Sequence, residues 1–450
     1  MKEQWLKYLD RQAPRYTSYP SALRFDGSVD AALYSEKLRA VDLYEPLSIY
    51  VHIPFCRQLC WYCGCNMRVE NNYERVRAYV DALLDEICIV GSAVGGKGRI
   101  ANVHFGGGTP NILVADDLAC ILDAIERELG LTDDARLAIE LDPRLMHKGD
   151  ARLLAALGFH RMSLGVQDFD VGVQWAINRM QRFEMVAACV KDMRDAGVND
   201  ISFDLLYGLP KQSLQSFEDT LDKAITLAPD RFAVFGYAHL PQMIPRQRMI
   251  CDDQLPGIEM RADLAALADE KLVAAGYLQI GFDHYARPDN ALAQALGDGR
   301  LHRNFQGFTD DIAETTIGFG ASAISFAHGV YAQNEKDIGA YQREIAARSL
   351  PVAKGVIRTA RDERCAAAIT RLLCDFEVNL GDMLELTSGA EKHQIDQALA
   401  ALERDGVVRR RGDVVCVNEG ARSLCRVVAA SIDPYSHAAQ KATPKIATAV

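Results

Sequence analysis

The sequence predicts an α/β protein: a partial (β/α)6 barrel with an N-terminal arm and a smaller, mostly helical C-terminal domain. Two observations lead to this class. Apolar runs of strand length alternate with helical stretches six times, and polar or glycine-rich residues follow each run. Strands separated by helices pair in parallel through right-handed crossovers. The carboxyl ends of such strands form the face where barrel enzymes build their sites, so we expect a catalytic barrel.

The predicted elements can be placed along the chain. Strands are expected at 47–53, 100–105, 137–141, 162–166, 201–206 and 232–237, with helices at 73–90, 183–196 and 217–227 among others. The repeat stops near residue 290, and the small-residue run 317–325 suits close backbone approach. Near the end, a helix at 394–405 precedes a β-wing with a strand at 414–417. We expect four regions: an arm (1–45), the barrel (46–290), a barrel-flanking segment for substrate and cofactor (291–354) and a winged-helix-like C-terminal domain (355–450).

Composition excludes several classes of protein. Of the 450 residues, 49% are hydrophobic and 25% charged, as in globular proteins, and the net charge of −11 argues against general nucleic-acid binding. Three arginines at 409–411 therefore indicate a solvated wing edge rather than a nucleic-acid site. No apolar run reaches the length of a membrane span, and the N-terminus lacks the apolar run of a signal peptide. No long apolar seam is visible, which favours a monomer.

Four cysteines follow the first predicted strand. Cys56, Cys60 and Cys63 have the spacing C-x3-C-x2-C, and Cys65 comes two residues later. In a chain without an export signal, a reducing cytoplasm is expected, and clustered thiols indicate metal or cluster ligation rather than disulfides. Zinc normally takes four ligands, whereas three cysteines leave one iron of a [4Fe-4S] cluster open to a small molecule. A loop that is merely rich in cysteine is the structural alternative, and the eight remaining cysteines are scattered, most of them expected to be buried.

Further polar residues follow the other strands. Gly107 and Gly108 belong to a triple glycine that allows a backbone to approach a ligand, and Thr109 adds a hydroxyl. Glu140 ends the third strand and could bind ribose hydroxyls or an ammonium group, or form a salt bridge. Taken singly, such residues cap helices or pair with neighbours, but together at one barrel end they indicate a polar ligand site. The remaining members of this set are Gln167, Arg179 and Asp204.

The segment 14–20 is too rich in proline and aromatic residues for a regular helix. Two interpretations stay open for it. It could be an extended arm that packs its tyrosines on the main domain, or an arm that covers an active-site mouth and offers Arg15 to an anion.

The cysteine spacing, with the aromatic Tyr62 just before the last cysteine, resembles the radical S-adenosylmethionine (SAM) superfamily. This resemblance implies a radical-SAM barrel in which the methionyl group of SAM chelates the fourth iron of a [4Fe-4S] cluster. An electron from the cluster, supplied by an electron donor, then cleaves the sulfonium bond and gives a 5'-deoxyadenosyl radical.

A narrower resemblance rests on motifs along almost the whole chain: 14–20, Cys65 added to the cysteine motif, 106–110, 165–168, 178–179, 204–210, 238–241, 283–284 and 302–307. Together they resemble the oxygen-independent coproporphyrinogen III oxidases. That family converts two propionates of coproporphyrinogen III to vinyl groups, giving protoporphyrinogen IX in haem synthesis, and holds two SAM molecules side by side. The radical takes hydrogen from the propionate β-carbon, and carbon dioxide and one electron are then lost.

The resemblance also implies residue roles. Cys56, Cys60 and Cys63 would bind the cluster. The cluster-bound SAM would contact Tyr50, Gly107, Glu140 and Ile324. The second SAM would contact Tyr62, Gly108, Thr109, Gln167, Arg179, Asp204 and Ala238. Cys65, Gln306 and Arg15 would be needed for turnover, and Arg15, Arg24 and Arg303 are candidate partners for the substrate carboxylates.

Three other functions remain as alternatives. A haem chaperone of the same superfamily lacks Cys65, the 14–20 arm and the 302–307 segment, all of which are present here. A radical SAM enzyme acting on haem itself, for example by ring opening, is another possibility. A purely structural iron–sulfur protein is disfavoured by the two ligand-shaped regions and the six-unit barrel.

Overall fold

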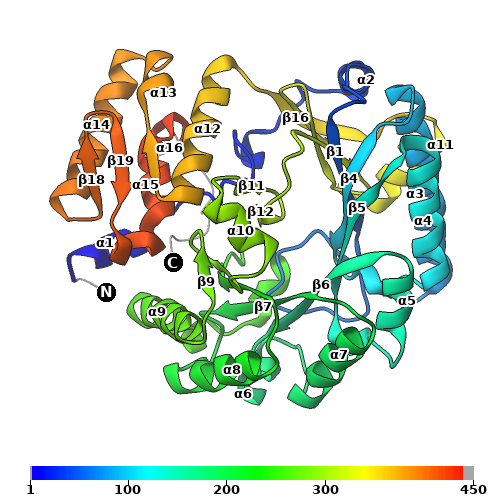
Figure 1. Ribbon diagram of the computed structural model, residues 1–450, viewed down its shortest axis with the longest axis horizontal. Coiled ribbons are helices and arrows are strands. Elements are labelled where there is room, and N and C mark those ends of the chain that lie inside the picture. Colours follow the sequence, from blue (N-terminus) through cyan, green and yellow to red (C-terminus); the bar gives the residue numbers. More distant parts are fainter. Residues whose placement is uncertain (1–2, 439–450) are drawn as a thin grey trace.

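A sheet of twelve strands organises the computed structural model, which describes residues 3–438 (Figure 1). Residues 1–2 of the predicted arm and 439–450 of the predicted C-terminal domain lie outside the described residues. The strand order is β16-β15-β14-β13-β1-β4-β5-β6-β7-β8-β10-β9. The barrel strands are β1 (Pro46–Ile53), β4 (Arg99–Gly107), β5 (Leu131–Leu141), β6 (Phe159–Gln167), β7 (Asp200–Tyr207) and β8 (Arg231–Gly236). The flanking strands are β9 (Leu278–Ile280), β10 (His284–Ala286), β13 (Thr315–Phe319), β14 (Ile324–Ala327), β15 (Val330–Asn334) and β16 (Val352–Ile357).

The six barrel strands are parallel neighbours, which confirms the six predicted β/α units. The sheet ends at β16 on one side and β9 on the other, so the barrel is open, as predicted. A seventh parallel strand was not predicted: β13 pairs with β1, placing Ile317 beside Ile49. Residues 315–334 therefore extend the barrel's own sheet from the segment that was predicted to flank it. The domain boundaries at 45, 290 and 354 stay a prediction.

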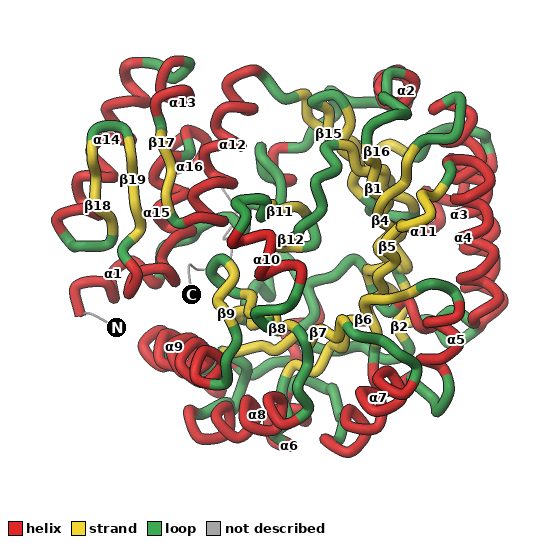
Figure 2. Tube along the Cα trace, in the orientation of Figure 1, coloured by secondary structure: helices red, strands yellow, loops and turns green. Residues whose placement is uncertain are grey.

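Helices cover the outside of the curved sheet, whereas loops, the short helix α10 and a small hairpin are drawn within its curve (Figure 2). The strand sequences are continuous apolar runs because both faces of the sheet are covered. Helix α4 instead has apolar residues at helical spacing, and Leu118, Ile121 and Ile125 are buried on one face. Within residues 3–438, no helix combines the length and apolarity needed to cross a bilayer. The helices up to residue 346 are α1 (Leu6–Leu9), α2 (Ala31–Arg39), α3 (Tyr73–Val94), α4 (Ala115–Leu129), α5 (Asp150–Ala156), α6 (Val171–Ala176), α7 (Phe183–Asp195), α8 (Leu214–Thr226), α9 (Ile258–Ala274), α10 (Ala291–Gly297) and α11 (Ile338–Ala346).

The C-terminal region is a mostly helical unit with a small wing (upper left in Figure 1). Its helix and wing hairpin match the prediction, while a third strand, β17, joins the hairpin unpredicted. Arg410 on the wing pairs with Asp396 at 2.8 Å, in keeping with a solvated wing edge. The elements are α12 (Ala360–Asp375), β17 (Glu377–Asn379), α13 (Gly381–Glu385), α14 (Gly389–Arg404), β18 (Val408–Arg411), β19 (Val414–Val417), α15 (Cys425–Ile432) and α16 (Pro434–Ala438).

The N-terminal arm joins the barrel to this unit. The hydroxyls of Tyr16 and Tyr19 donate hydrogen bonds to the carboxylate of Asp433, at 3.1 and 2.9 Å. The tyrosine hydroxyls therefore anchor on the junction of α15 and α16, whereas one of the two interpretations of the arm packed its tyrosines on the main domain. Arg15, between them and the barrel, donates to the carbonyl of Gly236 at the end of β8 (3.2 Å).

Candidate active site

The cysteine loop follows β1 at the carboxyl end of the barrel. It rests on the end of α6, because the Trp61 amide donates to the carbonyl of Ile177 (3.0 Å) and the Asn178 side chain donates to that of Leu59 (2.8 Å). Of the three predicted ligands, Cys60 is buried at 7% exposure, while the other two are half-buried. The loop is therefore held in place by backbone contacts and leaves its thiols at the barrel mouth.

Each of the three predicted ligands has a different hydrogen-bond partner. The Cys56 thiol lies 3.2 Å from the Thr109 hydroxyl, and the Cys63 thiol accepts from the Cys65 amide at 3.4 Å. The Cys60 sulfur accepts from Arg144 and Arg179, both at 3.5 Å.

The pKa values of the thiols differ with these surroundings. Burial raises the pKa of the Cys56 thiol to about 12. A hydrogen bond from the Cys65 thiol lowers the pKa of Cys63 to about 6.

Within residues 3–438, no three His, Cys, Asp or Glu side chains converge as they would on one metal ion. A [4Fe-4S] cluster needs a different arrangement of thiolates from a single metal ion, because each thiolate binds a different iron atom.

The triple glycine packs the end of β4 against the cysteine loop. A Cβ at Gly108 would lie 2.7 Å from the carbonyl oxygen of Phe55, and one at Gly107 would lie 2.8 Å from the ring of His52. Gly107 also has φ +118°, which disfavours any side chain. The glycines thus allow the backbone to approach the loop itself, a protein contact that the sequence interpretation as a ligand cradle did not include.

Glu140 lies beside this strand and has two partners. Its Oε1 is 3.0 Å from Nε2 of His104, and its Oε2 accepts from the Gly107 amide at 3.3 Å. The Tyr50 ring stacks on His104 at 6.0 Å between centroids, and its hydroxyl is 3.0 Å from Nδ1 of His52. The predicted residues Tyr50, Gly107 and Glu140 therefore lie together, and the Glu140 carboxylate also contacts the His104 ring.

Arg179 links the cysteine loop to the next two strand ends. Besides Cys60, it contacts Asp142 at 3.4 Å and donates to the carbonyl of Gly165 at 2.6 Å. The Asp142 carboxylate accepts from Arg144 at 2.6 Å, and although burial opposes its ionisation, the two arginines hold its pKa below the ordinary value.

Asp204 and Gln167 lie further along the barrel. Asp204 accepts from the Ser163 hydroxyl at 3.4 Å, and burial, with repulsion from Glu140, raises its pKa to about 7. Gln167 is buried and has a left-handed backbone, φ +67°.

Three predicted cofactor contacts remain. The carbonyls of Tyr62 and Ala238 both accept from the Gln247 side chain, at 2.9 and 3.0 Å, so these two residues lie close together. Ile324 begins β14, and a Cβ at Gly318 of β13 would lie 2.6 Å from its carbonyl oxygen.

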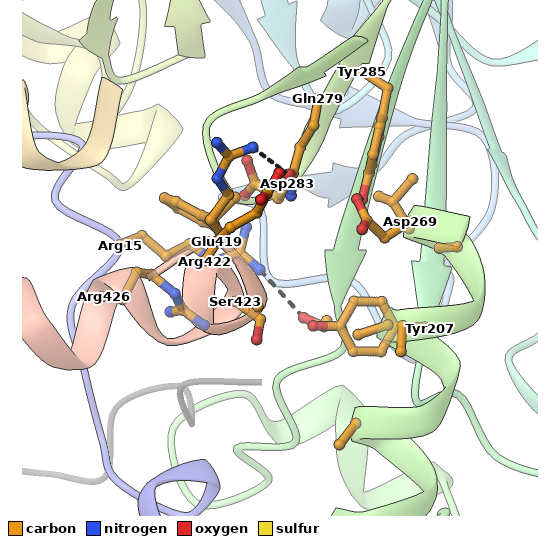
Figure 3. A pocket seen from close by; sticks show the side chains of 18 residues that line it. Arg15, Tyr207, Asp269, Gln279, Asp283, Tyr285, Glu419, Arg422, Ser423 and Arg426 are labelled. Atoms are coloured by element: carbon orange, nitrogen blue, oxygen red, sulfur yellow. Dashed lines mark hydrogen bonds between the residues drawn. The ribbon is translucent and has the colours of Figure 1, made fainter. Parts of the chain in front are cut away.

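Arg15 lies on a cavity of about 200 Å³ beside the end of β8 (Figure 3). Arg15, Arg422 and Arg426 come from one side of it, and Tyr207 and Tyr285 from the opposite side (Figure 3). The guanidinium of Arg15 also stacks on Phe235, which packs in the same small apolar cluster as Tyr62. Arg15 therefore lies next to the apolar cluster against which Tyr62 of the cysteine loop also packs.

Gln306 and Arg303 belong to the hairpin of β11 (His302–Asn304) and β12 (Gly307–Thr309). Arg303 donates to the carbonyl of Arg15 at 3.1 Å, which ties this hairpin to the arm. Arg24 lies elsewhere, against Tyr435 of the C-terminal unit.

Comparison with known proteins decides the family. Residues 50–224 match the model of the radical SAM superfamily. The chain is 42% identical to the oxygen-independent coproporphyrinogen III oxidase of Bradyrhizobium diazoefficiens over 96% of both chains, and 38% identical to that of Pseudomonas aeruginosa over 96% and 95%. The chain belongs to the oxygen-independent coproporphyrinogen III oxidase family. The solved coproporphyrinogen III oxidase of Escherichia coli, described as a radical SAM enzyme, superposes with a TM-score of 0.88 at 35% identity, covering 94% of this chain and 100% of that one.

Membership of the radical SAM superfamily makes the chain a radical SAM oxidoreductase and implies a [4Fe-4S] cluster and SAM. The cysteine loop fits the cluster. It offers three thiols at a barrel mouth, with two guanidiniums directed at one of them. Positive donors of this kind suit a cluster whose thiolate ligands carry negative charge.

Sequence reasoning missed three residues of this site. His52 supports Tyr50 and Gly107, and Asp142 and Arg144 organise the surroundings of Cys60. Asp142 and Arg144 did carry a signal, since they flank the proline directly after a predicted barrel strand. The roles predicted for individual site residues remain proposals.

Proposed function

We propose that this chain decarboxylates two propionates of coproporphyrinogen III to vinyl groups and so forms protoporphyrinogen IX without oxygen. One observation supports this most directly: the relationship to the oxidases extends over 96% of both chains, and so includes the arm and C-terminal unit as well as the cysteine loop. When bound, the cluster and SAM supply a 5'-deoxyadenosyl radical that takes hydrogen from the propionate β-carbon, after which carbon dioxide and one electron leave.

The residues around the cysteine loop hold the cluster and the first SAM. Cys56, Cys60 and Cys63 each bind one iron. Glu140, fixed by His104 and the Gly107 amide, offers a carboxylate oxygen to the SAM ammonium or ribose. Tyr50 and Ile324 complete the walls of this site.

A second SAM binds next to the first in our proposal. Arg179 offers its guanidinium to the carboxylate of this molecule, and Asp204 offers an oxygen to its polar groups. Since burial raises the pKa of Asp204 to about 7, this carboxyl can hold a proton near neutrality and act as a donor. The other proposed contacts are Tyr62, Gly108, Thr109, Gln167 and Ala238.

The substrate binds at the cavity beside Arg15, a region that we call the arm side. Arg15 lies at the end of β8 beside a cavity to which Arg422 and Arg426 also contribute guanidiniums. Guanidiniums are suited to carboxylates, of which the substrate has four. Cys65, exposed next to Cys63, and Gln306, on the hairpin tied to the arm, act in turnover rather than in cluster binding.

The partners and location follow from the same proposal. An electron donor must reduce the cluster, and the chain acts as a monomer in the cytoplasm. Size-exclusion chromatography with light scattering tests the oligomeric state.

An anaerobic assay tests the function. Reconstituted protein is incubated with SAM, a reductant and coproporphyrinogen III, and porphyrins and 5'-deoxyadenosine are quantified by chromatography. We expect vinyl product in step with 5'-deoxyadenosine, two per substrate if each propionate consumes one SAM. 5'-Deoxyadenosine without vinyl product would indicate another substrate, and tight haem binding without either product would indicate a haem chaperone.

A further inference from the structure

A compact ionic network lies behind the cysteine loop, at the end of β5. Asp142 is only 7% exposed, and its Oδ2 accepts from Arg144 at 2.6 Å and from Arg179 at 3.4 Å. Its Oδ1 accepts from the backbone amide and Nε of Arg144, both at 3.0 Å. One carboxylate thus fixes two guanidiniums in a buried position, where an unpaired charge would be costly.

Both guanidiniums also reach the same sulfur. Nη2 of Arg144 and Nη1 of Arg179 lie 3.5 Å from the Sγ of Cys60. The hydrogen-bond partners of the other two thiols are neutral, a hydroxyl for Cys56 and a backbone amide for Cys63, although Arg246 and Arg179 also act on the Cys63 thiol through space. Cys60 is therefore the ligand of the three whose sulfur accepts hydrogen bonds from guanidiniums.

Arg144 is the part of this network that the SAM sites do not use. Its Nη1 donates to Oε1 of Gln58 at 3.2 Å, so the side chain spans the cysteine loop and the end of β5. Arg179 lacks a hydrogen-bond partner for its Nε, and its direction depends on Asp142 and the carbonyl of Gly165. Removing Arg144 would take one charge from Cys60 and leave Asp142 free to draw Arg179 closer.

Charged donors at a cluster sulfur have a known consequence. The reduced cluster carries one more negative charge than the oxidised cluster, and hydrogen bonds to the cluster's sulfurs therefore favour reduction. The size of the effect is greatest where solvent is excluded, as it is around the buried Cys60.

We propose that Arg144 is a positioning residue which, through its contacts with Cys60 and Asp142, raises the reduction potential of the cluster and orients Arg179. This inference rests on the proposed function only in assigning Cys60 as a cluster ligand. It goes beyond the residue roles that the family resemblance implies, none of which involves Arg144.

A purely structural role for Arg144 would make a different prediction. Asp142 caps the short helix Pro143–Leu145 by accepting from the Arg144 backbone amide, a contact that survives any side-chain replacement at 144. Arg144→Gln removes the charge and retains the cap, while Arg144→Lys retains the charge without the planar fork. Arg152→Gln, at an exposed position on α5, is the control for loss of one positive charge.

The test is a redox titration of the reconstituted full chain, followed by electron paramagnetic resonance of the reduced cluster. For Arg144→Gln we expect iron and sulfide contents equal to the wild type and a midpoint potential shifted to a more negative value. The midpoint potential of Arg144→Lys should lie between those of the wild type and Arg144→Gln, and that of Arg152→Gln should equal the wild-type value.

Other results of the same titration would overturn the inference. An unchanged potential in Arg144→Gln with a full cluster overturns the inference, as does an equal shift in Arg152→Gln. If Arg144→Gln binds no cluster, the midpoint potential of Arg144→Lys tests the inference instead. A wild-type potential in Arg144→Lys overturns the inference, and a more negative potential supports it. Failure of the proposed function is seen separately, as a wild-type protein that holds the cluster and yields no vinyl product.

Discussion

The cysteine loop and the N-terminal arm both serve the same end of the barrel, but they are built in different ways. The loop is a continuous stretch of ten residues, and its partners lie after the neighbouring strands β4 and β5 and after helix α6. The arm is held by residues more than 200 positions away, through Arg15 to Gly236 and the tyrosines to Asp433. We infer that the loop side generates the radical and that the arm side holds the substrate, so variants should separate the two tasks.

This difference also explains which parts could be predicted from sequence. The six barrel strands follow from periodicity and the three proposed cysteine ligands from spacing, and both are local properties. β13 escaped prediction because it overlaps the small-residue run 317–325 and its pairing with β1 spans more than 260 positions. The anchor at Asp433 and the contacts of Arg144 and Arg179 with Cys60 join residues more than 80 positions apart, which no sequence pattern specifies.

The largest effect is expected on the loop side. Cys60→Ser should abolish the cluster, and with it all SAM cleavage, because a neutral hydroxyl replaces a thiolate ligand. Iron content and the cluster's absorption spectrum provide the measurement, with Cys120→Ser on the exposed face of α4 as the control. An intact cluster spectrum in Cys60→Ser would refute the ligand assignment.

Cys65→Ser should reduce the formation of vinyl product nearly as much as Cys60→Ser does, but it should leave the cluster intact. The Cys65 amide, which donates to Cys63, is kept in this variant, so the ligand's backbone contact survives. We expect wild-type iron content and at least a tenfold loss of vinyl product. Normal turnover would make Cys65 a structural residue.

On the arm side, Asp433→Asn should reduce turnover while leaving the cluster unchanged. The buried carboxylate accepts from Tyr16, Tyr19 and Ser436, and loss of its charge should destabilise the anchor by about 1–3 kcal/mol. Chemical denaturation and the anaerobic assay measure the two effects. Asp405→Asn, which affects the side-chain contacts to α1 and not those of segment 14–20, is the matched control; equal losses of turnover in both variants would contradict a specific role for segment 14–20.

The smallest effect on turnover is expected at Glu86, away from both regions. This buried carboxylate accepts from the Gly320 amide, Asn334 and Tyr341, each at 2.7 Å, and burial raises its pKa to about 7. The folded state therefore binds a proton at Glu86 more tightly than the unfolded state does. Protonation of Glu86 stabilises the folded state fully below pH 4.5, and this stabilisation is lost as the pH rises towards 7. Glu86→Gln should remove that slope in urea denaturation measured from pH 5 to 8; an unchanged slope would contradict it.

Substrate binding to cluster-free protein tests the division of tasks most directly. We would measure anaerobic equilibrium dialysis of coproporphyrinogen III with Cys60→Ser, Arg15→Ala and the control Arg11→Ala. We expect Cys60→Ser and Arg11→Ala to bind like the apo wild type and Arg15→Ala to bind at least tenfold more weakly. Weak binding by Cys60→Ser together with unchanged binding by Arg15→Ala would contradict the assignment of the substrate to the arm side.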